Sequence, residues 1–259
     1  MSQDPRAWIA TLRNSHERLA SLVAAQSPEQ LRGPSYCADW SMAQVLSHLG
    51  SGAEIALLML PGALGQAEHV DRDAFQAVWD VWNAKSPDDQ AADCLVFDAK
   101  HVEALEQLSD GELARVSLPF FGMNLDSVGM IRLRLGEHAL HTWDVAVMGD
   151  PSARVSADAV TLLIDNVPDF LAPRLGRPRD VPLRVRIRTS NPDRDYLLIA
   201  AGEVTMPEWT GEGADSEVSM PSEALLRLAY GRLDPEHTPQ EVKGDPADLD
   251  QLRQVFPGF

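Results

Sequence analysis

The stretch Gly136-Glu137-His138-Ala139-Leu140-His141-Thr142-Trp143-Asp144 lies late in a long segment that predicts a helix, because its apolar residues recur at helical spacing. Glu137 and His141 are four residues apart, so a helix places them on one face, one turn above the other. A carboxylate and an imidazole at that spacing can bind one divalent metal ion. The stretch therefore predicts both a packed helix and part of a metal site.

A second apolar helix is expected much earlier, in Trp40-Ser41-Met42-Ala43-Gln44-Val45-Leu46-Ser47-His48-Leu49-Gly50. Ser41 and Gln44 have the spacing of a capping box at its start. Its lone histidine, His48, stands on an apolar background. If the two helices face each other, His48, Glu137 and His141 form a three-ligand site with an open fourth position, which is typical of catalytic rather than structural zinc.

Each of these residues also has an ordinary structural interpretation. A single histidine on an apolar helix, such as His48, is more often a satisfied core residue than a ligand. Glu137 and His141 can be a simple pair on one helix face. His138 lies one position off that face and is either a surface residue or an alternative ligand. The spacing alone leaves the metal site and the ordinary helix pair both open.

Length, composition and net charge limit the kinds of protein that this chain can be. The chain has 259 residues, of which 44% are hydrophobic and 24% charged, as in ordinary globular proteins of one large domain or two small ones. Its net charge of -17 argues against nucleic acid and anionic membranes as partners. No apolar run approaches the roughly 20 residues that span a bilayer, and the first residues lack an apolar signal core. We therefore expect a cytoplasmic protein with no membrane partner.

The two cysteines do not make a disulfide framework or a zinc-finger spacing. Cys37 comes just before the helix that carries His48, so it is either a thiol near the site or, more commonly, a small loop or core residue. Cys94 can equally be a free thiol.

The pattern changes character along the chain. The first two-thirds predicts helices over residues 5–25, 41–59, 72–84, 86–108, 124–148 and 156–175, with Asn124 or Asp126 as the cap of the fifth. Such a run fits an antiparallel bundle with its sites on inward faces. Leu183 to Thr189 alternates apolar and polar residues, which predicts a half-buried strand. Further strands are expected at 196–200 and 218–220 and further helices at 224–233 and 247–255. The predicted domains are residues 1–176 and 177–259.

Three motifs carry a resemblance to known proteins. Trp40-Ser41-x-x-x-Val45-Leu46-x-His48-Leu49 resembles the second-helix motif of the DinB-like superfamily. Arg134-x-x-Glu137-x-x-x-His141-x-Trp143-Asp144 resembles the third-ligand helix of one branch, the mycothiol-dependent maleylpyruvate isomerase family. The tail, with Ser219-Met220-Pro221-Ser222 and Gly231-Arg232-Leu233, is similar to that family's small C-terminal domain, which resembles a sterol carrier protein. Order, spacing and length agree over nearly the whole chain.

The resemblance implies a fold and an activity. The fold is α+β with two domains, a DinB-like antiparallel four-helix bundle followed by a small C-terminal α/β sandwich-type domain. The resemblance also implies zinc held by His48, Glu137 and His141, and mycothiol, the thiol of actinobacteria, as cosubstrate. In the isomerase the thiolate is thought to add to a conjugated double bond, permit rotation and leave, and other members act as S-transferases. The expected partner is a small electrophilic molecule.

Four further residues are candidates around this site. Arg134 shares the face of Glu137 and either pairs with it, binds a substrate carboxylate in a catalytic role, or is simply solvated. Asp144 either orients a ligand imidazole or makes a helix-end contact. Trp40 can wall the pocket, although a tryptophan beside a helix start usually packs. The resemblance places Arg232 at a cleft as a catalytic residue for an anionic substrate, where a surface arginine would look the same.

Other functions remain open at this stage. A zinc-hydroxide hydrolase would need an additional carboxylate base, and Glu54, six positions after His48, is not clearly on the same face. A non-enzymatic protein that binds a small molecule or lipid is motivated by the tail domain, since fold analogy does not decide function. A homodimer is also open, with the first helix, Trp79 and Trp82 as interface candidates.

Overall fold

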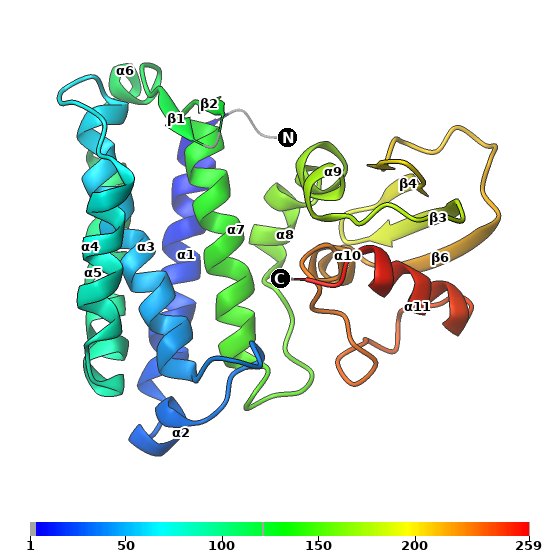
Figure 1. The fold of residues 1–259 in the computed structure, drawn as a ribbon, viewed down its shortest axis with the longest axis horizontal. Helices are drawn as coiled ribbons and strands as arrows, with labels where there is room; N and C mark the ends of the chain where they lie inside the picture. The colour runs from blue at the N-terminus through cyan, green and yellow to red at the C-terminus, as the bar shows by residue number, and fades with distance from the viewer. Residues whose placement is uncertain (1–3, 121, 259) are drawn as a thin grey trace. The chain divides into compact units, whose positions relative to one another are not determined.

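The structure is a computed structural model that describes residues 4–120 and 122–258. It divides into two compact units at Ala153 and Arg154, one built from long helices and one containing a four-stranded sheet (Figure 1). The expected two-domain α+β fold is confirmed. The division lies earlier than the boundary predicted after residue 176, because residues 154–176 pack with the C-terminal unit, where α8 (Ala157–Leu163) contacts α10 (Ser222–Ala229).

Four long helices form the N-terminal bundle. Helix α3 packs on α5, α5 on α1, α1 on α7 and α7 on α3, which closes the bundle. Its elements in chain order are α1 (Pro5–Ala24), α2 (Pro28–Arg32), α3 (Met42–Ala63), α4 (Arg72–Asn83), α5 (Pro87–Gln107), α6 (Asp110–Leu113), β1 (Leu118–Phe120), β2 (Met123–Leu125) and α7 (Ser127–Ala146).

Local sequence explains where the two helices of the predicted site begin. The Ser41 side chain accepts from the backbone N–H of Gln44, whose own side chain bonds back, so the predicted capping box starts α3. Asp126, one of the two predicted caps, accepts from the N–H of Gly129 and starts α7. These caps set the residue at which each helix begins, and with it which side chains of the helix face inward.

Helix α3 is the most apolar helix of the bundle. By length and composition alone it is apolar enough to cross a membrane, which corrects the expectation that no segment approaches such a length. However, 56% of its most apolar window is buried in the structure, and Val45, Leu46 and Leu49 are completely inaccessible. Its apolar character is therefore accounted for by packing in the bundle core.

Gly50 allows α3 to approach its neighbours closely. A Cβ at this position would lie 2.9 Å from the Cα of Cys94 on α5 and would overlap the ring of Trp82. Trp82 is itself fully buried and bonds through its indole N–H to Glu54 at 2.6 Å. The prediction that Trp82 serves an interface is therefore wrong, whereas Trp79 is 37% exposed.

The C-terminal unit is built on a sheet with the strand order β5-β4-β3-β6. β3 pairs antiparallel with β4 and parallel with β6, and its side chains alternate between buried and exposed as the sequence predicts. The helix expected over residues 156–175 is broken into α8, a π-helical turn and α9, with Pro168 and Pro173 at the starts of the last two. The remaining elements are the turn Val167–Leu171, α9 (Ala172–Leu175), β3 (Leu183–Ser190), β4 (Arg194–Ala200), β5 (Val204–Thr205), β6 (Ser216–Pro221) and α11 (Pro246–Val255).

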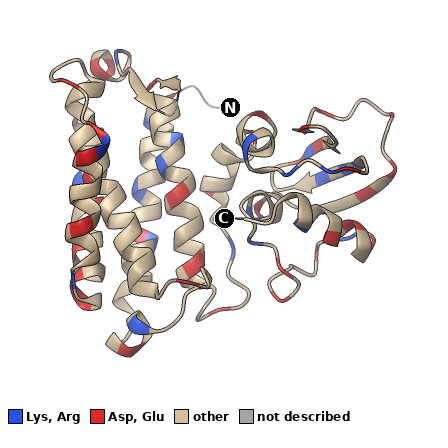
Figure 2. Cartoon of the chain, viewed as in Figure 1, with Lys and Arg blue, Asp and Glu red and all other residues tan. Residues whose placement is uncertain are grey.

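Basic residues are fewer than acidic ones, with 22 Lys and Arg against 39 Asp and Glu. In Figure 2 the lysines and arginines are scattered among acidic residues in both units.

Replacing Gly50 with alanine tests the close packing of α3. We expect Gly50→Ala to lower the free energy of unfolding by about 1–3 kcal/mol, because the clash with Trp82 and Cys94 outweighs the gain in helix propensity. Gly111→Ala is the matched control, since no atom lies within 4 Å of a Cβ placed there. Urea unfolding followed by far-ultraviolet circular dichroism measures both, and equal stability of the two variants would contradict the packing argument.

Candidate metal centre

Helices α3 and α7 bring the three predicted ligands together. His48 Nε2 lies 3.1 Å from Glu137 Oε2, and His141 Nε2 lies 3.6 Å from the same oxygen. The two imidazole rings have centroids 4.8 Å apart. One donor atom from each of His48, Glu137 and His141 lies within 4.8 Å of the others, so the predicted grouping is present in the structure.

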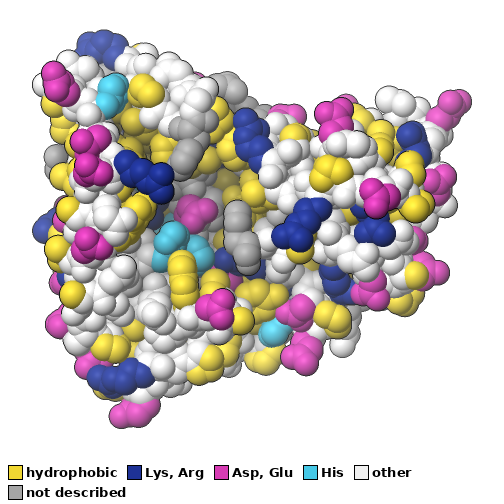
Figure 3. Space-filling view, viewed as in Figure 1, with side chains coloured by type: hydrophobic (Ala, Val, Ile, Leu, Met, Phe, Trp, Pro, Cys, Tyr) yellow, Lys and Arg dark blue, Asp and Glu magenta, His cyan; other side chains and the backbone are white. Residues whose placement is uncertain are grey.

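The donor set suits a zinc ion with an exchangeable position. Two imidazoles and one carboxylate are common protein ligands of catalytic zinc, and the three leave one tetrahedral position for water or substrate. The cluster is also accessible, because the side chains of His48 and Glu137 are 39% and 47% exposed. Figure 3 shows histidine side chains at the surface of the bundle with acidic and hydrophobic side chains beside them.

Asp144 fixes the orientation of His141. The Asp144 carboxylate is fully buried, and its Oδ2 lies 2.7 Å from His141 Nδ1. An ionised carboxylate only accepts, so Nδ1 carries a proton, and Nε2 is the nitrogen that faces Glu137 and can exchange its own proton for a metal ion. Such an imidazole–carboxylate contact is the usual support of a metal-bound histidine. Asp144 therefore contacts the imidazole of His141, and its part in orienting a metal ligand remains a prediction.

Cys37 lies beside this contact. Its Sγ is 3.3 Å from the same Asp144 oxygen, so the half-buried thiol donates to the carboxylate that holds His141. Cys37, His141 and Asp144 form a second group of closely spaced donor atoms, but it shares His141 with the first group. Of the two alternatives for Cys37, the structure favours the thiol near the site. Cys94 is a buried core residue.

The electrostatics favour a positive charge at His141, which lies between the carboxylates of Glu137 and Asp144. Partial desolvation by neighbouring atoms opposes ionisation of the half-exposed Glu137, but hydrogen bonds with His141 and His48 outweigh it and hold the pKa of that carboxyl well below its usual range. Burial likewise opposes a charged His141, but its hydrogen bonds with Asp144, Cys37 and Glu137 raise its pKa to about 10. A bound divalent cation would supply the same positive charge by displacing the proton.

Trp40 covers one side of the two imidazoles. Its ring centroid lies 5.2 Å from that of His48 and 6.2 Å from that of His141. The loop that carries it is held to α7, because the backbone N–H of Tyr36 donates to the Asp144 carbonyl at 3.3 Å. Ser35 Oγ also donates to the Trp40 carbonyl at 2.9 Å. Trp40 therefore flanks two of the candidate ligands, and its role as a pocket wall remains a prediction.

Arg134 does not contact Glu137. Its Nη2 donates to Asp98 Oδ1 at 2.8 Å and to the Leu49 carbonyl at 2.9 Å, and its side chain is only 10% exposed. The pairing with Glu137 and the solvated alternative are therefore both wrong. A contact of Arg134 with a substrate carboxylate remains a prediction.

His138 is neither a surface residue nor an alternative ligand. It is fully buried, with Nε2 2.8 Å from Asp98 Oδ2 and Nδ1 2.8 Å from Ser15 Oγ. His16 Nδ1 contacts the same Asp98 oxygen at 2.8 Å. The sequence analysis missed Asp98 and His16, and the one available signal was an aspartate in the middle of an amphipathic helix.

Arg232 lies in the C-terminal unit and is buried. Only 8% of it is exposed, and its Nη1 donates to the Tyr230 carbonyl at 3.1 Å. The surface interpretation of Arg232 is therefore wrong, and its catalytic role remains a prediction.

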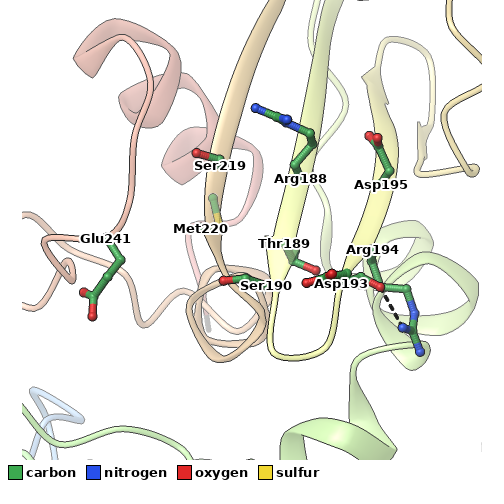
Figure 4. Close-up of a pocket in the computed structure, with 9 residues that line it drawn as sticks. All are labelled: Arg188, Thr189, Ser190, Asp193, Arg194, Asp195, Ser219, Met220 and Glu241. Atoms are coloured by element: carbon green, nitrogen blue, oxygen red, sulfur yellow. Dashed lines mark hydrogen bonds between the residues drawn. The ribbon is translucent and has the colours of Figure 1, made fainter.

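The C-terminal unit also contains a cavity of about 630 Å³ (Figure 4). Its arginines already have acidic partners, since Arg188 pairs with Glu217 at 2.5 Å and Arg194 with Asp165 at 2.6 Å. The mixture of charged and hydroxyl groups does not suit an apolar ligand. The cavity is lined by Arg188, Thr189, Ser190, Asp193, Arg194, Asp195, Ser219, Met220 and Glu241.

Comparisons with solved structures agree with this fold. The chain superposes on the crystal structure of the mycothiol-dependent maleylpyruvate isomerase with a TM-score of 0.68, at 12% identity and with 93% of each chain covered. A histidine-to-alanine mutant of that enzyme gives a TM-score of 0.67 with the same coverage. At this identity the likeness concerns the fold alone. The chain is also 25% identical over 125 residues to a Geobacillus thermodenitrificans (strain NG80-2) protein named "Putative metal-dependent hydrolase", a match that covers 46% of this chain and 68% of that protein.

Family models match both units of the chain. The model of the mycothiol maleylpyruvate isomerase N-terminal domain matches residues 12–146, which is more than half of the sequence and includes all three candidate ligands. The model of the corresponding C-terminal domain matches residues 154–251. Both matches follow the division seen in the structure, and together they show that the chain belongs to the mycothiol maleylpyruvate isomerase family.

Proposed function

We propose that the protein is a zinc-dependent enzyme that uses mycothiol, adding the thiolate to a small electrophilic substrate. The observation that carries the proposal is the convergence of His48, Glu137 and His141, whose donor atoms lie within 4.8 Å of one another at an accessible point of the bundle. Family membership supports mycothiol as the thiol, because the relatives that share both domains are named for their dependence on it.

The residues around the cluster have distinct parts in this function. Zinc, when bound, supplies a Lewis acid that keeps a coordinated thiol deprotonated at neutral pH. His48, Glu137 and His141 hold the ion, and Asp144 keeps His141 in the tautomer that presents Nε2. Trp40 shields the two imidazoles on one side and reduces the access of water. The partial exposure of His48 and Glu137 leaves an approach for the thiol.

The proposed chemistry covers two outcomes of one addition. In a cis–trans isomerisation of the maleylpyruvate type, the thiolate adds to a conjugated double bond, the resulting single bond rotates and the thiolate leaves. In an S-transfer, the thiol stays on the electrophile. The family name supports the isomerisation. Both outcomes need the same metal-held thiolate and differ only in the pocket for the second substrate.

A hydrolase is the second candidate, favoured by the name of the Geobacillus relative. It needs a carboxylate that acts as a base next to the metal-bound water. Glu54 does not fill this role, because it bonds the indole of Trp82 at 2.6 Å. Asp144 is already bonded to His141 and Cys37. The thiol enzyme is therefore the better interpretation, and the polar lining of the C-terminal cavity speaks against a lipid-binding protein.

The proposal includes a cellular setting. Mycothiol is a thiol of the actinobacterial cytoplasm, so the enzyme is proposed to work there on small molecules, without nucleic acid or membrane partners. A homodimer also belongs to the proposal, with the first helix and the exposed Trp79 as its remaining interface candidates.

Removal of a ligand tests the metal centre. We expect His48→Ala and His141→Ala each to abolish both zinc retention and thiol-dependent turnover, because two remaining donors bind zinc weakly. Elemental analysis and far-ultraviolet circular dichroism of the purified proteins measure metal content and helix content. His69→Ala, an exposed histidine on the same bundle, serves as the control. Full zinc content in both ligand variants would contradict the ligand set.

Calorimetric titration with mycothiol tests the thiol. We expect binding to the zinc-loaded protein and none to the protein stripped of metal by a chelator, because the metal is the proposed anchor of the thiolate. Equal binding to both forms would show that zinc does not hold the thiol. Zinc without mycothiol binding would favour the hydrolase.

Arg232→Ala tests the contribution of the C-terminal unit. We expect turnover of a carboxylate-bearing substrate to fall by about 10- to 100-fold, the size of one lost charge-assisted hydrogen bond, with zinc content unchanged. Steady-state kinetics and elemental analysis of the same preparation measure both quantities. A substrate-independent loss of activity accompanied by lost secondary structure would instead assign Arg232 to folding.

A further inference from the structure

A buried polar cluster lies in the bundle beside the metal centre and shares no side chain with it. We call it the Asp98 cluster, consisting of His16 on α1, Asp98 on α5, and Arg134 and His138 on α7. Asp98 is completely buried and contacts all three other members at 2.8 Å. A buried carboxylate is tolerated only with such partners, so α1, α5 and α7 are tied together at one point.

The charge of this cluster is balanced by Arg134. Burial opposes ionisation of Asp98, but His138, His16 and Arg134 together hold the pKa of its carboxyl well below its usual range. Burial lowers the pKa of His138, which favours a neutral ring that donates through Nε2 to Asp98 and accepts at Nδ1 from the Ser15 hydroxyl. The guanidinium of Arg134 is therefore the permanent cation next to the carboxylate.

Arg134 also reaches the helix that carries His48. Besides Asp98, its Nη2 bonds the carbonyl of Leu49, the residue that follows His48. Gly52 leaves room for this contact, because a Cβ there would stand 3.0 Å from Arg134 Nη1. The guanidinium thus lies directly against the backbone of α3, within one turn of the ligand.

The same side chain originates one turn before Glu137. Arg134 precedes Glu137 by three residues, so its backbone belongs to the α7 segment that carries the carboxylate ligand. A single side chain therefore joins the segment bearing Glu137 to the segment bearing His48, and Asp98 fixes its guanidinium from a third helix. A change in this contact would alter the separation of the two ligands without touching either.

We propose that Arg134 and Asp98 are a positioning pair that sets the distance between His48 and Glu137 and thereby the metal affinity of the site. The proposal rests on the metal centre proposed above. It gives Arg134 a role that needs no contact with metal or substrate. A pair that served only the stability of the bundle would affect unfolding but would leave the metal affinity of the folded protein unchanged.

Zinc affinity of folded variants tests the pair. Arg134→Met and Asp98→Asn are each titrated with zinc against a chromophoric chelator, at a temperature below the unfolding midpoint of every variant. We expect zinc binding to weaken about 10- to 100-fold in each, as found for residues that support metal ligands. The double variant should bind about as weakly as Arg134→Met alone, because the two residues act as one unit.

Two further variants make the outcome specific. Glu106→Gln removes an exposed ion pair between α1 and α5, in which Glu106 lies 2.6 Å from Arg13, and it should leave zinc affinity unchanged. Gly52→Val keeps every charge but displaces the Arg134 guanidinium from α3, so it should weaken zinc binding. If Arg134→Met does not fold, Gly52→Val serves as the test of the positioning pair in its place. Wild-type zinc affinity in folded Asp98→Asn and Gly52→Val would overturn the positioning pair. Failure of the wild-type protein itself to bind zinc would instead overturn the metal centre.

Discussion

The buried carboxylate of Asp98 is the constraint on which the geometry of the bundle depends. A charge with no access to water must have donors around it, and here they come from α1 and α7. Satisfying Asp98 therefore fixes the rotation of α7 about its own axis. Once His138 is turned toward Asp98, the neighbouring positions Glu137 and His141 are turned toward α3 and His48.

Helix α7 thus presents two pairs of functional residues on adjacent faces. Arg134 and His138 are four residues apart and form an interior pair that contacts Asp98, and Glu137 and His141 repeat the spacing three residues later toward His48. The interior pair ties α7 to α5, and the pair beside His48 offers metal ligands. Two hydrophobic residues in place of Arg134 and His138 could give the bundle the same stability. The polar pair is therefore explained better by its directional hydrogen bonds, which hold α7 in one orientation, than by a gain in stability.

The sequence predicted the features that depend on local spacing. The capping box at Ser41, the cap at Asp126 and the alternating strand β3 follow from short patterns, whereas the approach of His48 to α7 was expected only through the family resemblance. The Asp98 cluster could not be predicted in this way, because His16 and Asp98 are 82 residues apart and neither belongs to a motif. The burial of Trp82 and the division at residue 153 likewise depend on tertiary packing, which local patterns do not contain.

The buried carboxylates of Asp98 and Asp144 differ in whether an arginine is among their partners, and this difference decides how each can support the metal centre. Asp98 contacts the guanidinium of Arg134, which stays protonated at any pH at which the protein is folded. The negative charge of Asp98 is therefore always neutralised by Arg134. Asp144 faces the imidazole of His141, which can exchange its proton on Nε2 for a metal ion while Nδ1 stays bonded to the carboxylate. An arginine in place of His141 would satisfy Asp144 equally well but could bind no metal. With arginine at position 134, Asp98 ties together the helices that carry the candidate ligands, whereas with histidine at position 141, Asp144 contacts a candidate ligand directly.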